Sequence, residues 1–270
     1  MSSDAEDNTA DHVPRRLSGI DPRWAAGVLS AVAIAAVLAM VSFRPPPLPD
    51  FDAIDDIPAR KQAFFEYLAP IVRAENERVR EQRRRLLEIL DAAADGDAPG
   101  WLDRRWLAKL SAEYEVEWNA DRPLAAAETL RRRVDVVPVA LALVQAATES
   151  GWGRSRFATE ANNLFGHWCY EPGCGIAPAR RNRDAAHEVA AFDSVRESVA
   201  RYLHNLNTHA AYLPLRMIRA RLRAADRRLT AMALAEGLER YSERREAYVE
   251  EIKTVIRVNQ PILERIGASM

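Results

Sequence analysis

Residues 138–153 read PVALALVQAATESGWG, an apolar run that ends in a carboxylate and a glycine turn. Pro138 is suited to the start of a helix, and the residues that follow it are apolar on nearly every side. Gly151 can adopt the left-handed conformation that closes a helix. The stretch therefore predicts a buried helix that ends at Ser150 and has the core of the protein packed around it.

Glu149 stands at the end of this predicted helix. The carbonyl groups at a helix C-terminus carry partial negative charge, which disfavours an ionised carboxylate there, and burial beside Trp152 disfavours it further. Both effects raise the pKa of the carboxyl group toward the range that a general acid needs near neutral pH. The residues alone leave one alternative open, a glutamate that simply turns to water at a helix end.

The periodicity elsewhere predicts a mainly α-helical protein with one irregular lobe of α+β character at 165–193. Apolar residues recur at helical spacing through most of the body, whereas residues 162–185 are rich in loop formers. One short strand is expected at 189–192. Helices are expected at residues 58–94, 101–118, 124–133, 138–150, 194–207, 210–223, 229–237 and 246–259.

Residues 24–43 contain no charged side chain. A helix of that length spans about 30 Å, the thickness of the hydrocarbon core of a bilayer. Arg15, Arg16 and Arg23 precede the run and four aspartates follow it, so the positive-inside rule places the N-terminus in the cytoplasm. The sequence thus predicts a transmembrane anchor at 23–43, with residues 44–270 on the other side of the membrane. A cleaved signal peptide is the alternative.

The segments around the anchor differ in composition. Residues 1–22 are polar without an apolar period, which predicts a disordered cytoplasmic tail. Residues 44–57 begin with RPPPLP and predict a stiff Pro-rich linker. Residues 58–100 are expected to form a helical arm, in which Pro70 is a candidate kink.

The net charge of −1 over 270 residues gives no bias toward nucleic acid, and no nucleic-acid partner is predicted. Cys169 and Cys174 form a Cys-x4-Cys pair with too few neighbouring ligands for a metal site. In an oxidising compartment such a pair predicts a disulfide, in agreement with the topology of the anchor. Neither a metal nor an organic cofactor is predicted.

Two motifs together resemble a known enzyme family. ESGWG at 149–153 and NNLFG at 162–166 are similar to the glucosaminidase domain of glycoside hydrolase family 73, in particular to its membrane-associated bacterial Bax-type proteins. The resemblance covers roughly residues 50–260. Further segments that carry it are KQAFFEYL at 61–68, DVVP at 135–138, FGHWC at 165–169, GCG at 173–175, YSER at 241–244 and YV at 248–249.

The resemblance implies a lysozyme-like fold, here at 101–260, with a helical lobe, a small β-lobe and a cleft between them. It implies cleavage of the β-1,4 bond after N-acetylglucosamine in peptidoglycan, with Glu149 as the catalytic acid. It also places Tyr241 in the cleft near the acid and makes Tyr248 a further candidate. At 241–244 the chain has YSER, as Bax-type proteins do, where many relatives have YATD.

A glycosidase usually pairs its acid with a second carboxylate. In the family this group lies in the β-lobe and varies, so the candidates are Glu188, Glu171 and Asp184. Glu188 ranks first because it precedes the expected strand. The alternative is a substrate-assisted route, in which the acetamide group of the sugar attacks and no second carboxylate is needed.

Aromatic side chains near the acid are candidates for stacking on sugar rings. Trp168 and Tyr170 lie in or beside the cysteine loop, whereas Trp152 and Phe165 have the core as their alternative position. Asn163 is either a turn residue or a group that orients the acid, and the resemblance favours the second role.

The sequence predicts a peptidoglycan hydrolase of the endo-β-N-acetylglucosaminidase type, whose partner is the glycan strand. One alternative is a lytic transglycosylase, which shares the fold and a Glu-Ser acid, although the NNLFG segment argues against it. The other is a wall-binding scaffold with weak or no activity, which stays open while the second carboxylate is unassigned.

Overall fold

The computed structural model describes residues 47–178 and 187–268. They form a mainly helical body with one small three-stranded antiparallel sheet, which confirms the predicted fold class at that level. Within these two ranges, no helix combines the length and the apolar character that a membrane span requires. The predicted tail and anchor, and the candidate Asp184, lie outside the described residues and stay predictions.

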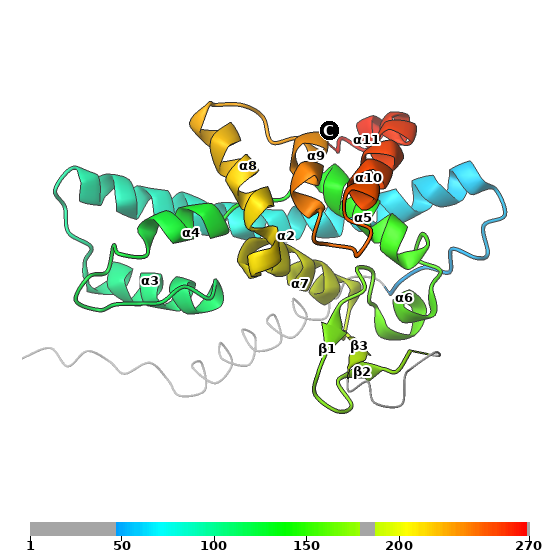
Figure 1. Ribbon diagram of the computed structural model, residues 1–270, viewed down its shortest axis with the longest axis horizontal. Coiled ribbons are helices and arrows are strands. Elements are labelled where there is room, and N and C mark those ends of the chain that lie inside the picture. Colours follow the sequence, from blue (N-terminus) through cyan, green and yellow to red (C-terminus); the bar gives the residue numbers. More distant parts are fainter. Residues whose placement is uncertain (1–46, 179–186, 269–270) are drawn as a thin grey trace, which may run out of the picture. The chain divides into compact units, whose positions relative to one another are not determined.

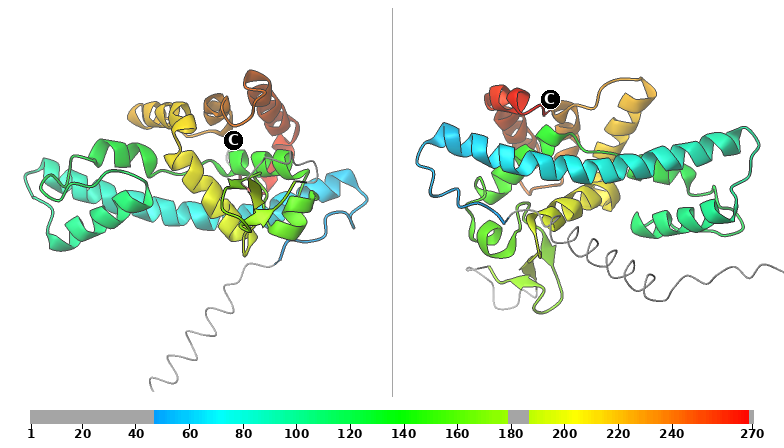
Figure 2. Two further views of the ribbon diagram at one scale, coloured as in Figure 1. Left: turned by 60° about the horizontal axis from the view of Figure 1, so that its bottom comes forward. Right: turned by 180° about the vertical axis from the view of Figure 1, so that it is seen from behind.

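Helix α2 (Ile57–Ala94) runs along the helical body from one end to the other (Figure 1, Figure 2). It begins where the Asp56 side chain accepts a hydrogen bond of 2.8 Å from the amide of Ala59, and it continues through Pro70 as one helix. In its middle, the buried Asn76 side chain bonds both the amide and the carbonyl group of Val137. These bonds fix α2 beside the start of the next buried helix.

The second half of α2 packs with α3 (Trp101–Glu113) and α4 (Ala127–Arg133) around a smaller core. The first half of α2 packs into the main core instead, so one helix joins the two. The predicted boundary between an arm at 58–100 and a domain at 101–260 stays a prediction. The smaller core consists of Leu86, Ile89, Leu107, Leu110, Tyr114, Ala126, Leu130 and Val134.

Helix α5 (Val139–Ser150) lies in the main core, as the sequence predicts. Every residue at 140–147 is buried, because α2, α9 (Ala231–Ala235) and α10 (Glu246–Val258) pack against it. Gly151 takes the left-handed conformation, with φ of 58°, and ends the helix. The other helices are α6 (Arg156–Ala161), α7 (Val195–Thr208), η1 (Ala210–Tyr212), α8 (Leu213–Ala224), η2 (Glu236–Leu238) and α11 (Gln260–Arg265).

The small sheet has β3 (Glu188–Ala190) in its centre, between β1 (Trp168–Cys169) and β2 (Gly175–Ile176). Both outer strands pair antiparallel with β3. The expected strand at 189–192 corresponds to β3, which starts one residue earlier and ends two residues earlier. Strands β1 and β2 were not predicted, because two residues are too few for an alternating pattern to be detected.

Two local features hold the sheet together. The predicted disulfide between Cys169 and Cys174 is present and closes the loop that joins β1 to β2. Gly175 lies so close to β3 that a Cβ atom there would be 1.9 Å from the carbonyl oxygen of Val189. Only glycine allows the two strands to approach in this way.

Asp135 joins α2 and α8 just before α5 begins. Its buried carboxylate accepts two hydrogen bonds, of 2.8 and 3.1 Å, from Arg223 of α8. Arg83 of α2 and the buried Arg219 of α8 lie 3.7 and 3.8 Å away. Burial alone raises the pKa of Asp135, but Arg219, Arg223 and Arg83 together lower it below the usual 3.8. The carboxylate therefore stays ionised and holds these helices together.

We expect Asp135→Asn to lower the free energy of unfolding at pH 7 by about 3 kcal/mol or more, because three arginines lose their counter-charge. Urea unfolding measures this loss. The contribution is present above the unfolded-state pKa and disappears as the pH falls below 3.8, through the lowered folded-state pKa. As a control, Glu81→Gln removes an exposed ion pair with Arg84 and should leave the urea midpoint unchanged. Equal losses in both variants would contradict the assigned role of Asp135.

Candidate active site

Glu149 is the last residue but one of α5, at the point where the buried helix reaches a hollow in the surface. Its Oε1 atom accepts a hydrogen bond of 2.7 Å from the hydroxyl group of Tyr248 on α10. The turn that follows is held by Ser150, whose hydroxyl group donates to the carbonyl of Ala146 and accepts from the amide of Gly153, at 2.6 and 2.8 Å. The Glu-Ser-Gly sequence therefore fixes the end of α5 and the carboxylate on it.

The half-buried carboxyl group of Glu149 has a raised pKa, as the sequence predicts. The main cause is burial, which disfavours the ionised form. The hydrogen bond from Tyr248 and the positive charge of Arg244 lower the pKa, and the negative charge of Glu251 raises it. The balance leaves a weaker acid than a free glutamate, and this is the direction of shift that a general acid requires.

A pocket of about 400 Å³ opens beside Glu149, between the end of α5, the β-lobe and α7. Among the described residues that line it, Glu149 is the only one with a carboxylate. The wall is otherwise aromatic and polar, which suits a ligand with both ring faces and hydroxyl groups. Its other lining residues are Phe165, Gly166, His167, Trp168, Tyr170, Arg201, Asn205, His209, Tyr212 and Tyr241.

Three larger hollows lie elsewhere, and two of them lie beside α2. One, of about 560 Å³, lies between the end of α2 and residues 122–125 and has no carboxylate among its described lining residues. Another, of about 500 Å³, contains Arg83, Arg219 and Arg223, whose donors are engaged by Asp135 and by backbone carbonyl groups. The third, of about 420 Å³, lies at residues 115–133 and has two exposed glutamates, Glu115 and Glu117, in its described lining. Glu149 is a half-buried carboxyl group whose pKa is raised by burial, so we place the candidate site there.

The aromatic candidates divide into two groups. Trp168 and Tyr170 line the pocket and are 48% and 76% exposed, so part of each ring is open to a ligand; the Trp168 ring also contacts the ring of His187, at 4.6 Å. Phe165 also lines it but is buried, and its ring stacks on Tyr202 at 4.0 Å. Trp152 does not line the pocket; its ring packs on Phe64 and Phe65, at 5.9 and 5.1 Å. The structure thus brings three of these four aromatic residues to Glu149.

Tyr241 and Tyr248 lie side by side at the acid. Their rings are stacked, 5.4 Å apart and almost parallel. Tyr241 lines the pocket, and its hydroxyl group donates a hydrogen bond of 3.0 Å to the carbonyl of Phe165. Tyr248 is fully buried behind it and reaches Glu149 directly. Of the two tyrosines, it is therefore Tyr248 that bonds the acid, and Tyr241 holds the pocket wall.

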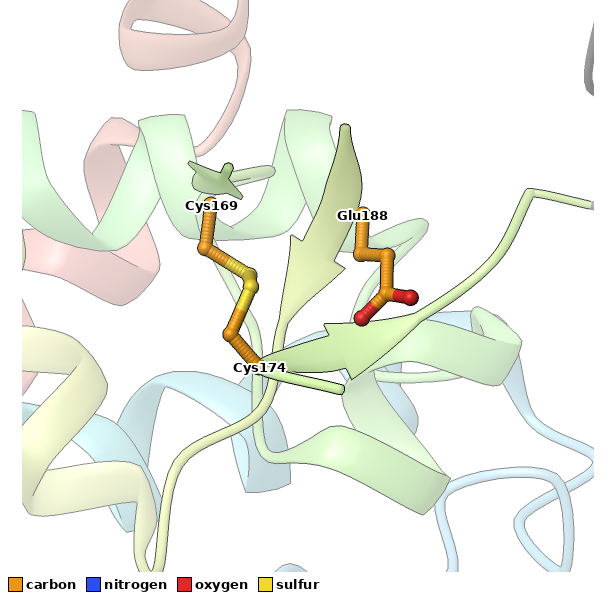
Figure 3. Close-up of side chains that lie close together, drawn as sticks. All are labelled: Cys169, Cys174 and Glu188. Atoms are coloured by element: carbon orange, nitrogen blue, oxygen red, sulfur yellow. A yellow bond between two sulfur atoms is a disulfide. The ribbon is translucent and has the colours of Figure 1, made fainter. Parts of the chain in front are cut away.

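The two described candidates for a second carboxylate, Glu188 and Glu171, do not line this pocket. Glu188 lies on β3, beside the disulfide (Figure 3), and its Oε2 atom accepts a hydrogen bond of 3.0 Å from the amide of Gly175. Glu171 lies in the exposed turn of the cysteine loop. Glu188 and the two sulfur atoms fall within 4.8 Å of one another, but both sulfurs are bonded in the disulfide and are not free thiolates. Glu188 thus joins β2 to β3 in the structure.

Asn163 and His167 shape the loop that forms one wall of the pocket. The buried Asn163 side chain donates to the carbonyl groups of His167 and Ala190, and it accepts from the amides of Phe165 and His167. All four bonds go to backbone groups. His167 has a pKa lowered to about 4, because of burial and the nearby charge of Arg201, and is therefore neutral at pH 7.

Sequence reasoning missed Gln145 and Tyr202, which lie behind the acid. Tyr202 of α7 donates to Gln145 at 2.6 Å, and Gln145 donates to Tyr248 at 3.0 Å. A signal was present, because Gln145 is a polar residue in an apolar helix and stands four residues before Glu149, on the same face. Arg201, Asn205, His209 and Tyr212 were also missed as pocket residues, because only the fold brings α7 and η1 to the end of α5.

Glu149→Gln is expected to stabilise the fold at pH 7, because it removes a half-buried carboxyl group that is costly to ionise. Burial raises the pKa of this group for the same reason. The native state of the wild type binds the proton more tightly than the unfolded state, so its stability falls as the pH rises from 4.5 through the folded-state pKa. Thermal unfolding should give similar midpoints for both proteins below pH 4.5 and a higher midpoint for the variant above it. A variant that is less stable at every pH would contradict the raised pKa.

Comparison with known proteins agrees with this site. A family model described as Glucosaminidase, mannosyl-glycoprotein endo-beta-N-acetylglucosaminidase, matches residues 124–261, which include Glu149 and every described residue of the pocket wall. Protein bax of Escherichia coli strain K12 is 33% identical over 216 residues, which cover 80% of this chain and 76% of that protein. No solved structure matches the chain. The chain therefore belongs to the glucosaminidase family, glycoside hydrolase family 73, and family membership implies a glycosidase that acts on peptidoglycan.

Proposed function

We propose that the protein is a peptidoglycan hydrolase of the endo-β-N-acetylglucosaminidase type and that Glu149 is its general acid. One observation carries the proposal: a half-buried carboxyl group with a raised pKa lines a pocket in which no other described lining residue has a carboxylate. Cleavage of the β-1,4 bond after N-acetylglucosamine is the finer specificity that the family resemblance implies.

In the proposed reaction, Glu149 donates its proton to the glycosidic oxygen as the bond to the anomeric carbon breaks. The carboxylate that remains keeps the hydrogen bond from Tyr248, which stabilises the new negative charge. Trp168 and Tyr170 offer exposed faces on which sugar rings can stack, and Arg201 and Asn205 offer polar groups to hydroxyl or acetamide groups. The pocket thus provides an acid and a binding surface for the sugar.

The described part of the pocket supports a substrate-assisted second step over catalysis by Glu188 or Glu171, while Asp184 lies outside the described residues and stays a candidate. Glu188 is held by the amide of Gly175 and does not line the pocket, and Glu171 lies in an exposed turn. In the substrate-assisted route, the acetamide oxygen bonds to the anomeric carbon, and water then opens the ring that has formed. Glu149, now ionised, accepts a proton from that water and returns to its starting state.

Digestion of purified cell walls by the full chain tests the proposed acid. Glu149→Gln should lower clearing at pH 7 by at least about 100-fold, because a general acid contributes at least that much. Glu188→Gln should keep most of the activity, since this carboxylate lies outside the pocket. Undiminished clearing by folded Glu149→Gln would rule out the proposed acid, and loss of clearing by folded Glu188→Gln would favour a carboxylate pair.

Two measurements separate this function from a lytic transglycosylase and from a wall-binding scaffold. They are the chemical ends of the released sugars and the fraction of the protein that binds to the wall. A glucosaminidase leaves reducing N-acetylglucosamine ends, whereas a lytic transglycosylase leaves anhydro-muramic ends. A scaffold would bind the wall without clearing it. The half-buried acid beside an open pocket supports the hydrolase over the scaffold.

We also propose that residues 23–43 anchor the protein in the inner membrane with the body in the periplasm. The support is the uncharged run at 24–43, the arginines before it, and the Cys169–Cys174 disulfide, which suits an oxidising compartment. Cell fractionation with an antibody to the C-terminal body should find the chain in membranes after washing with salt and carbonate. A soluble fragment that lacks the N-terminus would show cleavage instead.

A further inference from the structure

Gln145 is a fully buried polar side chain on α5, one helical turn before Glu149. Its Oε1 atom accepts a hydrogen bond of 2.6 Å from the hydroxyl group of Tyr202, and its Nε2 atom donates one of 3.0 Å to the hydroxyl group of Tyr248. Tyr248 in turn donates to Oε1 of Glu149 at 2.7 Å. Side chains from α7, α5 and α10 therefore form one continuous hydrogen-bond chain that ends at the acid.

The chain of bonds has one favoured direction. Tyr202 is fully buried, and among the described residues Gln145 is the only hydrogen-bond partner of its hydroxyl group. An unpaired buried donor is more costly than an unused lone pair, so Tyr202 must donate to Gln145. The carbonyl end of the Gln145 amide then faces Tyr202, its amino end faces Tyr248, and the proton of Tyr248 is directed to Glu149.

The second oxygen of the acid lies on the pocket side. A Cβ atom built on Gly166, which lines the pocket, would be 3.9 Å from Oε2 of Glu149. Since Oε1 already accepts the proton of Tyr248, a neutral carboxyl group carries its own proton on Oε2. That is the oxygen from which a proton can reach a ligand in the pocket.

We propose that Gln145 and Tyr202 are positioning residues, which direct the Tyr248 proton to Oε1 of Glu149 and so hold the proton of the acid on Oε2, beside the pocket. This inference rests on the proposed function of Glu149 as the general acid. Neither residue contacts the pocket, so both act through Tyr248.

In the reversed arrangement the proton of the acid points away from the substrate. Oε1 of Glu149 would donate to Tyr248, Tyr248 to the carbonyl oxygen of Gln145, and the Gln145 amino group to Tyr202. The hydroxyl proton of Tyr202 would then have no acceptor among the described residues. In Tyr202→Phe each arrangement leaves one end of the Gln145 amide unpaired, so the difference in free energy between the two arrangements shrinks. Part of the protonated acid then carries its proton on the wrong oxygen.

Other groups around Glu149 also affect its titration. Arg244 and Glu251 act on it through their charges, and Tyr212, Tyr241, Tyr202 and Tyr248 face it from η1, the loop before α10, α7 and α10. Arg201, His167 and His209 line the same pocket. Apart from the residue that is changed, each of these groups is present in every variant compared, so differences between variants report the hydrogen-bond chain.

The test uses the full chain and two measurements, the ¹³C titration of the Glu149 side-chain carboxyl group and the rate of wall clearing. The resonance of Glu149 is assigned by its loss in Glu149→Gln. Tyr202→Phe keeps the ring that stacks on Phe165 and should raise the pKa of Glu149 by about 0.3 unit, because the protonated form gains a second arrangement of comparable free energy. Clearing at a pH below the pKa of Glu149 should fall about twofold, because about half of the protonated acid then carries its proton on Oε1.

Gln145→Met leaves Tyr248 without the amide donor that polarises it, so Tyr248 becomes a weaker donor to the ionised Glu149. Both measurements should therefore shift in the same directions, and this variant serves if Tyr202→Phe does not fold. Tyr114→Phe is the matched control, because Tyr114 is a buried tyrosine that donates to a glutamine, Gln82, at 2.7 Å in the smaller core. Tyr114→Phe should lower the free energy of unfolding and leave the titration of Glu149 and the rate of wall clearing unchanged. A folded Tyr202→Phe or Gln145→Met with wild-type titration and rate overturns the inference. A wild-type chain that clears no wall overturns the proposed function instead, while the titration still reports on the hydrogen-bond chain.

Discussion

The site depends on the complete burial of α5. A helix covered by α2, α9 and α10 has no water to satisfy a polar side chain, so any such residue must find its partners inside the protein. Gln145 meets this requirement by bonding Tyr202 and Tyr248. Glu149 meets it at the helix end, with Tyr248 on one oxygen and the pocket beside the other. The same burial that stabilises the core therefore sets the acidity and the orientation of the candidate catalytic group.

The frame around α5 comes from parts of the chain that are far apart in sequence. Asn76 of α2 bonds the backbone just before α5, and Asp135 joins arginines of α2 and α8 at the same place. These contacts fix where α5 starts, while the turn of Ser150 and Gly153 fixes where it ends. Because both ends of α5 are fixed, the carboxylate of Glu149 needs little reorganisation to react. Preorganisation of this kind favours catalysis.

Predictions from the sequence were most successful for features that depend on residues close together in the chain. The buried helix, its glycine cap, the disulfide and Glu149 at the helix end follow from residues close together in the chain, and each is present. The walls of the pocket do not follow from neighbouring residues in the chain, because α7 and η1 reach α5 only through long-range packing. Strands β1 and β2 were missed for the same reason, since each has two residues and exists only by pairing with β3. The hydrogen-bond chain needs both kinds of information: Gln145 is visible as a polar residue in an apolar helix, but its partners are visible only in the fold.

The pKa of Glu149 depends mainly on two opposing effects, burial and the hydrogen bond from Tyr248. Arg244 would lower the pKa strongly if it paired with Glu149, but it forms an ion pair of 2.6 Å with Glu251 instead. The opposite charges of that pair partly offset each other at Glu149, so burial and the hydrogen bond from Tyr248 are the two largest effects on its pKa. A carboxylate that accepts several such bonds becomes too strong an acid to hold a proton at neutral pH, whereas one without any is costly to ionise. A single neutral donor, fixed in direction by Gln145, lets the group give up its proton and recover it again.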